Sequence, residues 1–111
     1  MEGKLTYLVE MMPWGLDITS RRWRAKTYEK CFQGNDAVDW LMKTLNLTER
    51  QQAVNLAQLL MDRSIFHRVN YSETFADKPA LYRFYQDDKK YYFVSSQIRQ
   101  KAFEHANNAV K

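Results

Sequence analysis

The side chains that most often serve catalysis or metal binding are few in this sequence and form no known arrangement. His67 and His105 are its two histidines, and neither their mutual spacing nor their spacing from Cys31 fits a zinc cluster. Asp36 and Asp39 are explained by the positive end of a helix dipole, so no acid–base pair is required. We therefore expect no enzyme activity, no catalytic residues, no metal and no cofactor.

Cys31 and His67 have simpler structural interpretations. Cys31 precedes Phe32 at the entry to an apolar helix and is expected to be a small buried hydrophobic residue. As the single cysteine of the chain it cannot form an internal disulfide, which indicates a reducing compartment. His67 is expected to face solvent or Tyr82.

The basic side chains are more informative, because they are concentrated. The net charge is +4, and five cations fall between residues 21 and 30 against Glu29 alone: Arg21, Arg22, Arg24, Lys26 and Lys30. Removing these from the 17 basic and 13 acidic residues leaves equal numbers of each sign. Such a local positive field attracts phospholipid, nucleic acid or an acidic protein.

The basic window falls in a predicted β-hairpin. Apolar and polar residues alternate over 16–19 and again over 22–28, and a tight turn is predicted at Ser20 and Arg21. In the second strand one face is predicted to carry Arg22, Arg24, Lys26 and Tyr28. Trp23 lies on the reverse face and is expected in the core. The basic row either protects a sheet edge from aggregation or binds an anionic partner.

The element that must position this hairpin is a helix within the stretch 31–45. Asn35 is predicted to cap it. One face is apolar and must be buried, since Val38, Leu41, Met42 and Leu45 recur at helical spacing. Trp40 lies off this face, so a second element is expected to pack on the flank of the helix.

The remaining pattern predicts an α+β fold, a winged-helix-like three-helix bundle with a β-hairpin arm after the first helix and a C-terminal β-wing. The first helix is predicted over 5–12, ended by Pro13, and the third over 48–62, with a capping box formed by Thr48 and Gln51. Strands over 65–69 and 81–85 form the wing. The domain is expected to span 5–85. Residues 86–111 are expected to add a strand over 91–94 and a helix to about 109, which docks on the domain or links it to a neighbour.

Four segments in order resemble the DEP domain family, which takes its name partly from dishevelled and pleckstrin. They are Gly15-Leu16, Arg21-Arg22-Trp23 with Lys26-Thr27-Tyr28, Cys31-Phe32 with Gly34 and Asp39-Trp40-Leu41, and Phe75-Ala76-Asp77 with Leu81-Tyr82-Arg83-Phe84. Ser64 stands where many members have glycine, and residues 86–111 lie outside the shared pattern.

The resemblance implies a non-catalytic module of intracellular signal transduction, often one that brings G-protein regulators, exchange factors or scaffolds to membranes. The family's basic contact positions correspond here to Arg21, Arg22, Arg24 and Lys26. We expect these residues to meet anionic phospholipids, together with a membrane-associated protein such as a receptor tail or a G-protein-pathway component. The module then belongs to a larger cytoplasmic chain, peripheral at the inner face of a membrane.

Two alternatives remain. In the first, the arm or the wing binds an acidic peptide and lipid takes no part. In the second, the winged helix binds nucleic acid through its third helix, but the exposed positions of that helix include Glu49 and Asp62 and sum to one negative charge, which phosphates would repel.

Overall fold

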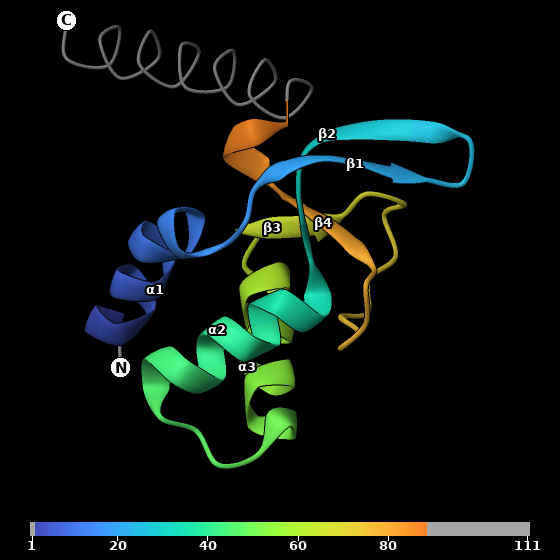
Figure 1. The fold of residues 1–111 in the computed structure, drawn as a ribbon. Helices are drawn as coiled ribbons and strands as arrows, with labels where there is room; N and C mark the ends of the chain where they lie inside the picture. Colours follow the sequence, from blue (N-terminus) through green and yellow to red (C-terminus); the bar gives the residue numbers. More distant parts are fainter. Residues whose placement is uncertain (1, 89–111) are drawn as a thin grey trace, which may run out of the picture.

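The computed structural model describes residues 2–88, so the strand predicted over 91–94 and the helix predicted to about 109 lie outside the described residues. The elements in order are α1 (Glu2–Gly15), β1 (Thr19–Trp23), β2 (Lys26–Gln33), α2 (Gly34–Leu45), α3 (Arg50–Asp62), β3 (Phe66–Arg68), β4 (Leu81–Phe84) and the 3-10 helix η1 (Tyr85–Asp87). This is the predicted α+β class, and the hairpin β1–β2 projects beyond the helices as the predicted arm (Figure 1).

The arm and the wing belong to one antiparallel sheet of order β1-β2-β4-β3. Strand β2 makes this possible because it serves two partners. Its first part pairs with β1, whereas Phe32 and Gln33 at its end pair with Tyr82 and Leu81 of β4. The arm is therefore a direct extension of the sheet that carries the core.

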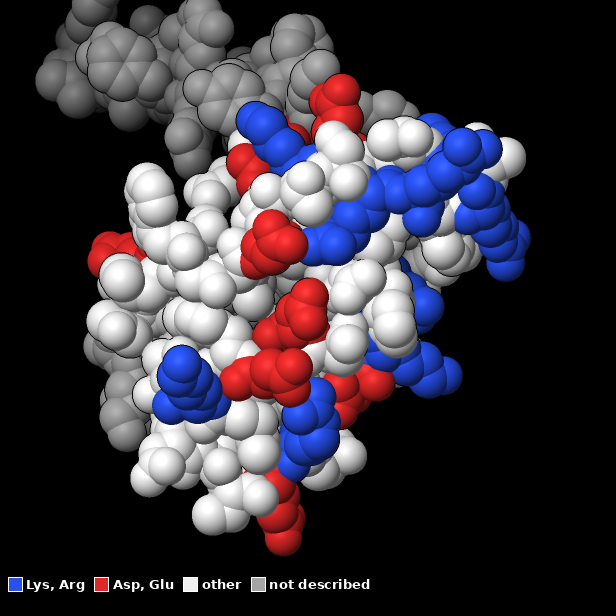
Figure 2. Space-filling model, viewed as in Figure 1, with Lys and Arg blue, Asp and Glu red and all other residues white. Residues whose placement is uncertain are grey.

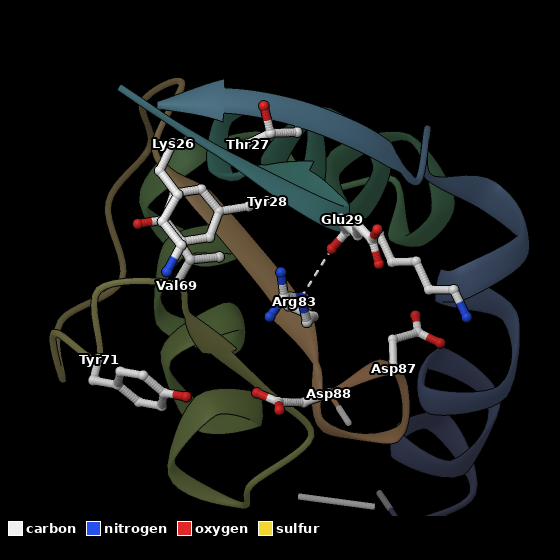
Figure 3. A pocket seen from close by; sticks show the side chains of 10 residues that line it. Lys26, Thr27, Tyr28, Glu29, Val69, Tyr71, Arg83, Asp87 and Asp88 are labelled. Carbon is white, nitrogen blue, oxygen red and sulfur yellow. Dashed lines mark hydrogen bonds between the residues drawn. The ribbon is translucent and has the colours of Figure 1, made fainter. Parts of the chain in front are cut away.

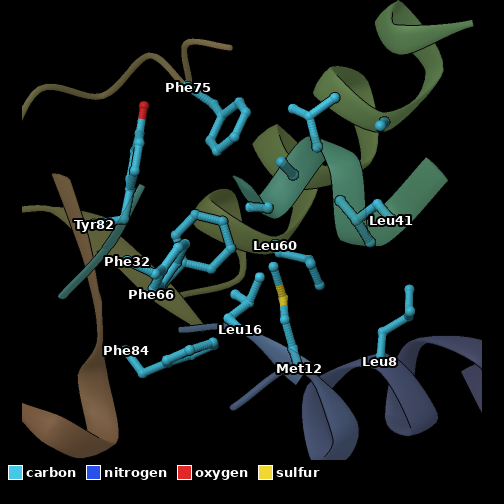
Figure 4. Close-up of a cluster of buried hydrophobic side chains, with 14 residues drawn as sticks. Leu8, Met12, Leu16, Phe32, Leu41, Leu60, Phe66, Phe75, Tyr82 and Phe84 are labelled. Carbon is cyan, nitrogen blue, oxygen red and sulfur yellow. The ribbon is translucent and has the colours of Figure 1, made fainter. Parts of the chain in front are cut away.

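The core lies between this sheet and the three helices (Figure 4). Phe32 is central, with ring centroids 5.2 Å from Phe66, 5.9 Å from Tyr82 and 4.9 Å from Phe84. Leu8 and other apolar residues of the helices close the opposite side. Such aromatic clusters gain from edge-to-face and offset packing as well as from area removed from water.

Helix α1 is longer than its pattern predicts, and the expectation that Pro13 ends it is wrong. Pro13 lies inside the helix. Helical backbone hydrogen bonding continues beyond it, since the Leu16 N–H donates to the Met12 carbonyl at 3.1 Å. Proline removes only one backbone donor, and the burial of Met12 and Leu16 holds the last turn in place. Gly15 lies against the indole of Trp40, which confirms that a second element packs on the flank of α2.

Helix α2 has the predicted apolar face but not the predicted cap. The N-cap position is Gln33, and the Asn35 side-chain oxygen is buried without a hydrogen-bond partner. The first backbone N–H groups are satisfied by the loop before β4, Gly34 donating to the Ala80 carbonyl and Asn35 to the Lys78 carbonyl, both at 2.9 Å. A tertiary contact thus replaces the side-chain cap.

The capping box of α3 is displaced by one residue from its prediction. Glu49 is the N-cap and Gln52 its reciprocal partner, rather than Thr48 and Gln51. The Gln52 side chain accepts bonds from the backbone N–H groups of both Glu49 and Thr48, at 3.2 and 3.3 Å. A glutamine follows three residues after both Thr48 and Glu49, so the sequence did not separate the two registers.

The wing strands β3 and β4 pair as predicted, with Phe66 opposite Phe84 and His67 opposite Arg83. The expectation for His67 is wrong, because its side chain is buried and bonded to Asp88. Of the helices within residues 2–88, none combines the length and the apolar character needed to cross a bilayer.

Candidate functional site

The arm is a hairpin closed by a two-residue loop at Arg24 and Ala25, with Trp23 opposite Lys26. The predicted turn at Ser20 and Arg21 is therefore wrong, since both residues lie within β1. The sequence lacks an Asn-Gly or Asp-Gly pair that would have marked the loop.

The new register also changes which side chains share a face. Directly opposed residues of an antiparallel pair point to the same side of the sheet. Arg21 and Tyr28 are opposed, as are Trp23 and Lys26, so these four share one face. Arg22 is opposed to Thr27 and lies on the other face. The predicted single row of Arg22, Arg24, Lys26 and Tyr28 is therefore wrong.

Two aromatic rings support the cations of the arm. The Trp23 and Tyr28 ring centroids lie 6.2 Å apart. The Arg24 guanidinium lies 4.5 Å from the Trp23 ring and the Lys26 ammonium 5.3 Å from the Tyr28 ring. Trp23 was expected in the core, but it is only partly buried and packs on a small separate cluster beside Cys31. The rings hold the positive charges in place while leaving them exposed.

Arg21 is placed differently from the other predicted contact residues. Its side chain is only 19 % exposed and donates to the Asp17 carbonyl at 2.9 Å, to the Asp17 carboxylate at 3.3 Å and to the Cys31 carbonyl at 3.4 Å. Arg21 therefore fastens the base of the arm, whereas Arg22, Arg24 and Lys26 are exposed along it.

Two basic residues of the arm have left-handed backbone conformations. Arg24 has φ 58° in the loop, and Lys30 has φ 54° where an extra residue of β2 interrupts the register between Thr19 and Arg21. For residues other than glycine this conformation costs roughly 1–2 kcal/mol. Glycine or asparagine would relieve the cost at the loop, yet the chain has arginine there.

A groove of about 450 Å³ runs between the arm and strand β4. Lys26 and Tyr28 lie across it from Tyr71 and Asp88, with Arg83 between them (Figure 3). Arg83 donates from Nε to the Glu29 carbonyl at 2.9 Å and so ties the arm to the wing.

Cys31 lies beside this groove, and its side chain is buried. Burial raises the pKa of its thiol, and the nearby Arg83 guanidinium, with Nη2 3.9 Å from Sγ, opposes that rise without cancelling it. The expectation of a small buried residue is confirmed.

Positive charge gathers on the arm, and the acidic side chains of the same face lie mostly away from its tip (Figure 2). Helix α3 offers no such surface. Its Arg50 is held by Asp77 through Nε at 2.7 Å and Nη2 at 2.9 Å, and by Asp39 through Nη1 at 2.7 Å. The bonds between Arg50 and Asp77 lower the pKa of the Asp77 carboxyl. Because Arg50 is already paired with two carboxylates, it is not available to bind a phosphate backbone.

The structure adds features that sequence reasoning missed. Arg83 was given no role of its own from the sequence, although it lies in the arm groove. Helix α1 presents Tyr7, Met11 and Trp14 to solvent, with exposures of 52 %, 40 % and 85 %. Their spacing of four and three residues places them on one helix face, a signal available in the sequence.

The chain matches the family model described as the domain found in Dishevelled, Egl-10 and Pleckstrin (DEP) over residues 15–84. A DEP domain-containing protein of Dictyostelium discoideum is 35 % identical over 88 residues, 78 % of this chain and 4 % of that protein. The phosphatidylinositol 3,4,5-trisphosphate-dependent Rac exchanger 1 protein of Mus musculus is 36 % identical over 74 residues, 67 % of this chain and 4 % of its own length.

The vacuolar membrane-associated protein IML1 of Saccharomyces cerevisiae is 29 % identical over 83 residues, 74 % of this chain and 5 % of that protein. The chain thus spans only a small fraction of these relatives. Among solved structures, the DEP domain of mouse pleckstrin2 superposes with a TM-score of 0.67 at 28 % identity, covering 80 % of this chain and 87 % of that one.

Proposed function

The chain belongs to the DEP domain family, and we propose that it is a non-catalytic signalling module that targets its parent protein to anionic membranes. The contact is made by the arm, β1–β2, through Arg22, Arg24 and Lys26, with Arg21 fixing the base of the arm. A membrane-associated protein supplies a second contact, and the module is peripheral at the cytoplasmic face.

The observation that carries this proposal is Arg24 at the tip of the arm. Its φ of 58° is a conformation that glycine adopts at no steric cost. Its guanidinium lies over Trp23 and remains exposed. Strained backbone at an exposed position often marks a functional residue, because selection for stability alone would remove it. A cation held at a tip despite such strain suits contact with an anionic surface.

The expected strength explains why a second contact is needed. Each basic side chain near an anionic leaflet contributes ~1 kcal/mol, so the three exposed cations contribute about 3 kcal/mol. That is weaker than the ~4 kcal/mol of a millimolar complex. Membrane residence therefore requires a protein partner or another domain of the parent chain, since linked weak contacts reinforce one another.

The names of two relatives support a membrane setting. The yeast protein is called vacuolar membrane-associated, and the mouse exchanger is called phosphatidylinositol 3,4,5-trisphosphate-dependent. These properties belong to proteins of which the matched segment is 4 or 5 %. They are consistent with a parent chain that works at a membrane.

The exposed face of α1 favours a second candidate, protein interaction without lipid. Tyr7, Met11 and Trp14 form an apolar stripe, and helices bind apolar grooves through anchors at such spacing. Exposed aromatic residues are also typical of binding hot spots. Glu10 beside the stripe disfavours an anionic membrane at this face and favours a protein with a basic rim.

Sedimentation with vesicles of graded phosphatidylserine content tests the lipid proposal. The native protein should pellet in proportion to vesicle charge and be released by salt. The Arg22→Glu/Arg24→Glu/Lys26→Glu variant should bind at least about a hundredfold more weakly, since it loses about 3 kcal/mol of attraction.

A matched control is the Lys43→Glu/Arg63→Glu/Lys78→Glu variant, which makes the same charge change at exposed positions away from the arm. Equal loss in both variants would show that net charge rather than the arm governs binding. If the native protein does not pellet at low salt, lipid contact by this domain is wrong and the α1 face becomes the leading candidate.

A further inference from the structure

His67 in β3 and Asp88 after η1 form a buried polar pair to which the proposed function assigns no role. Their side chains are 6 % and 7 % exposed, and His67 Nε2 lies 2.7 Å from Asp88 Oδ2. The Tyr71 ring stacks on the imidazole with centroids 4.8 Å apart, and the Tyr85 ring packs on it at 4.7 Å. The pair joins the end of the described chain to an edge strand of the sheet.

The geometry of the pair determines its protonation. His67 Nδ1 lies 2.9 Å from the backbone carbonyl oxygen of Arg68, which can only accept a hydrogen bond. A neutral imidazole has one N–H, so either tautomer turns a lone pair toward an oxygen, that of Arg68 or that of Asp88. Only the doubly protonated ring donates to both, and it then forms a buried ion pair with the Asp88 carboxylate.

The charged groups around His67 are of both signs. Arg83 lies directly opposite in β4, and Arg68 follows in β3. A hollow of about 340 Å³ is lined by His67, Tyr71 and Tyr85. Asp62 of α3 and Glu73 of the loop between β3 and β4 also line it. Asp87 lines the arm groove beside Asp88. Among the described residues, the carboxylate bonded to the ring is that of Asp88.

Asp88 connects this pair to the arm, because the same residue lines the arm groove across from Lys26 (Figure 3). While His67 is a cation, the charge of Asp88 is offset within the pair. When His67 loses a proton, one of its two hydrogen bonds is lost and the net charge of the pair beside the groove falls by one.

We propose that His67 and Asp88 form a proton-dependent latch, which holds residues 85–88 on β3 and sets the charge of the groove beneath the arm. The effect on the arm rests on the proposed membrane function, whereas the latch itself does not. Histidine changes its charge between about pH 5 and pH 8. The latch is closed while the ring holds both protons and opens when it loses one, so membrane contact weakens as the pH rises.

The first test observes the latch without lipid. Imidazole ¹⁵N NMR of the native protein at about pH 6 should show both His67 nitrogens protonated. In the Asp88→Asn variant the amide can donate to Nε2, so a neutral ring suffices and the second proton should be absent at the same pH. A neutral His67 ring in the native protein at about pH 6 would overturn the proposal.

The second test measures binding to vesicles that contain phosphatidylglycerol, whose charge is constant in this range. The native protein should bind about fivefold more weakly at about pH 8 than at about pH 6, the effect of one charge near an anionic surface. The Asp88→Asn variant should lose this dependence, and a His105→Asn variant should keep it.

The two readouts separate the two claims. Equal native binding at both pH values would overturn the coupling of the latch to the arm. Absence of binding at both would refute the proposed membrane function and the coupling with it, while the NMR result still decides the latch.

Discussion

A Cβ atom on Gly34 would lie 2.9 Å from Cε2 of the Tyr82 ring, and it would also overlap the Ala76 carbonyl oxygen. Gly34 is the first residue of α2, and Tyr82 is the buried centre of β4. The Tyr82 hydroxyl in turn accepts a bond from the Ala76 N–H at 2.8 Å. The loop before β4 thus packs directly on the backbone where the arm strand becomes a helix.

Replacing Gly34 with alanine is therefore expected to destabilise the protein by about 1–3 kcal/mol, the usual cost of overpacking a filled core. Its backbone angle is not the cause, since no glycine among the described residues has a positive φ. Urea unfolding followed by tryptophan fluorescence measures the change. A variant as stable as the native protein would show that the loop moves aside at no cost.

Replacing Ser64 with glycine is expected to have the opposite effect. Ser64 has φ 61° in the turn between α3 and β3, so glycine should stabilise the protein by about 1 kcal/mol. Ser20→Gly is the matched control, because Ser20 lies in regular strand β1, where glycine costs backbone entropy. Comparable unfolding midpoints for the two variants would contradict this explanation.

Arg24→Gly is expected to separate stability from function. The change should raise the free energy of unfolding by about 1 kcal/mol because the loop strain is removed. It should also weaken vesicle binding about fivefold through the loss of one charge. Unfolding and vesicle sedimentation are measured on the same preparation, with Arg22→Gly in β1 as a control that loses the charge without relieving strain. If Arg24→Gly increased both the free energy of unfolding and vesicle binding, a contact role for Arg24 would be refuted.

The Arg50–Asp77 pair is expected to contribute a pH dependence at the acid end. Its hydrogen bonds lower the pKa of Asp77 below the ordinary 3.8, so folding favours the ionised carboxylate. The stabilisation is present above that value and is lost as the pH falls through the lowered one. The effect is small because both side chains are partly solvated.

Acid unfolding of the native protein and of an Asp77→Asn variant measures this contribution. The variant should be less stable than the native protein near neutral pH, and the two should converge at low pH. A difference that is constant with pH would assign the contribution to shape rather than to charge.

The local pattern was sufficient where one face of an element had to be buried. The apolar spacing of Val38 and Leu41 located α2, and the runs before and after the wing loop located β3 and β4. The concentration of cations between residues 21 and 30 likewise identified the arm without any knowledge of its shape. Hydrophobic burial is dictated by side-chain type and spacing, which a sequence displays directly.

The local pattern failed where a backbone group could find more than one hydrogen-bond partner, or where a turn could form at more than one position. The cap of α2 comes from the distant Lys78 and Ala80 carbonyls rather than from Asn35. The hairpin turns at Arg24, a residue that carries no turn signal, and this displacement moved Arg22 to the opposite face from Lys26. A shift of the turn reverses the facing of side chains, because strand residues alternate between the two faces.

The sequence alone determined the α+β class, the apolar faces of the helices and strands, and the position of the basic arm. These follow from composition and periodicity, which act over a few neighbouring residues. Only the tertiary structure decided which cations of the arm are exposed, that Arg21 and Arg83 serve as ties, and that His67 meets Asp88. Those relationships join residues 10 to 54 positions apart, and they depend on strand register and packing that no local pattern records.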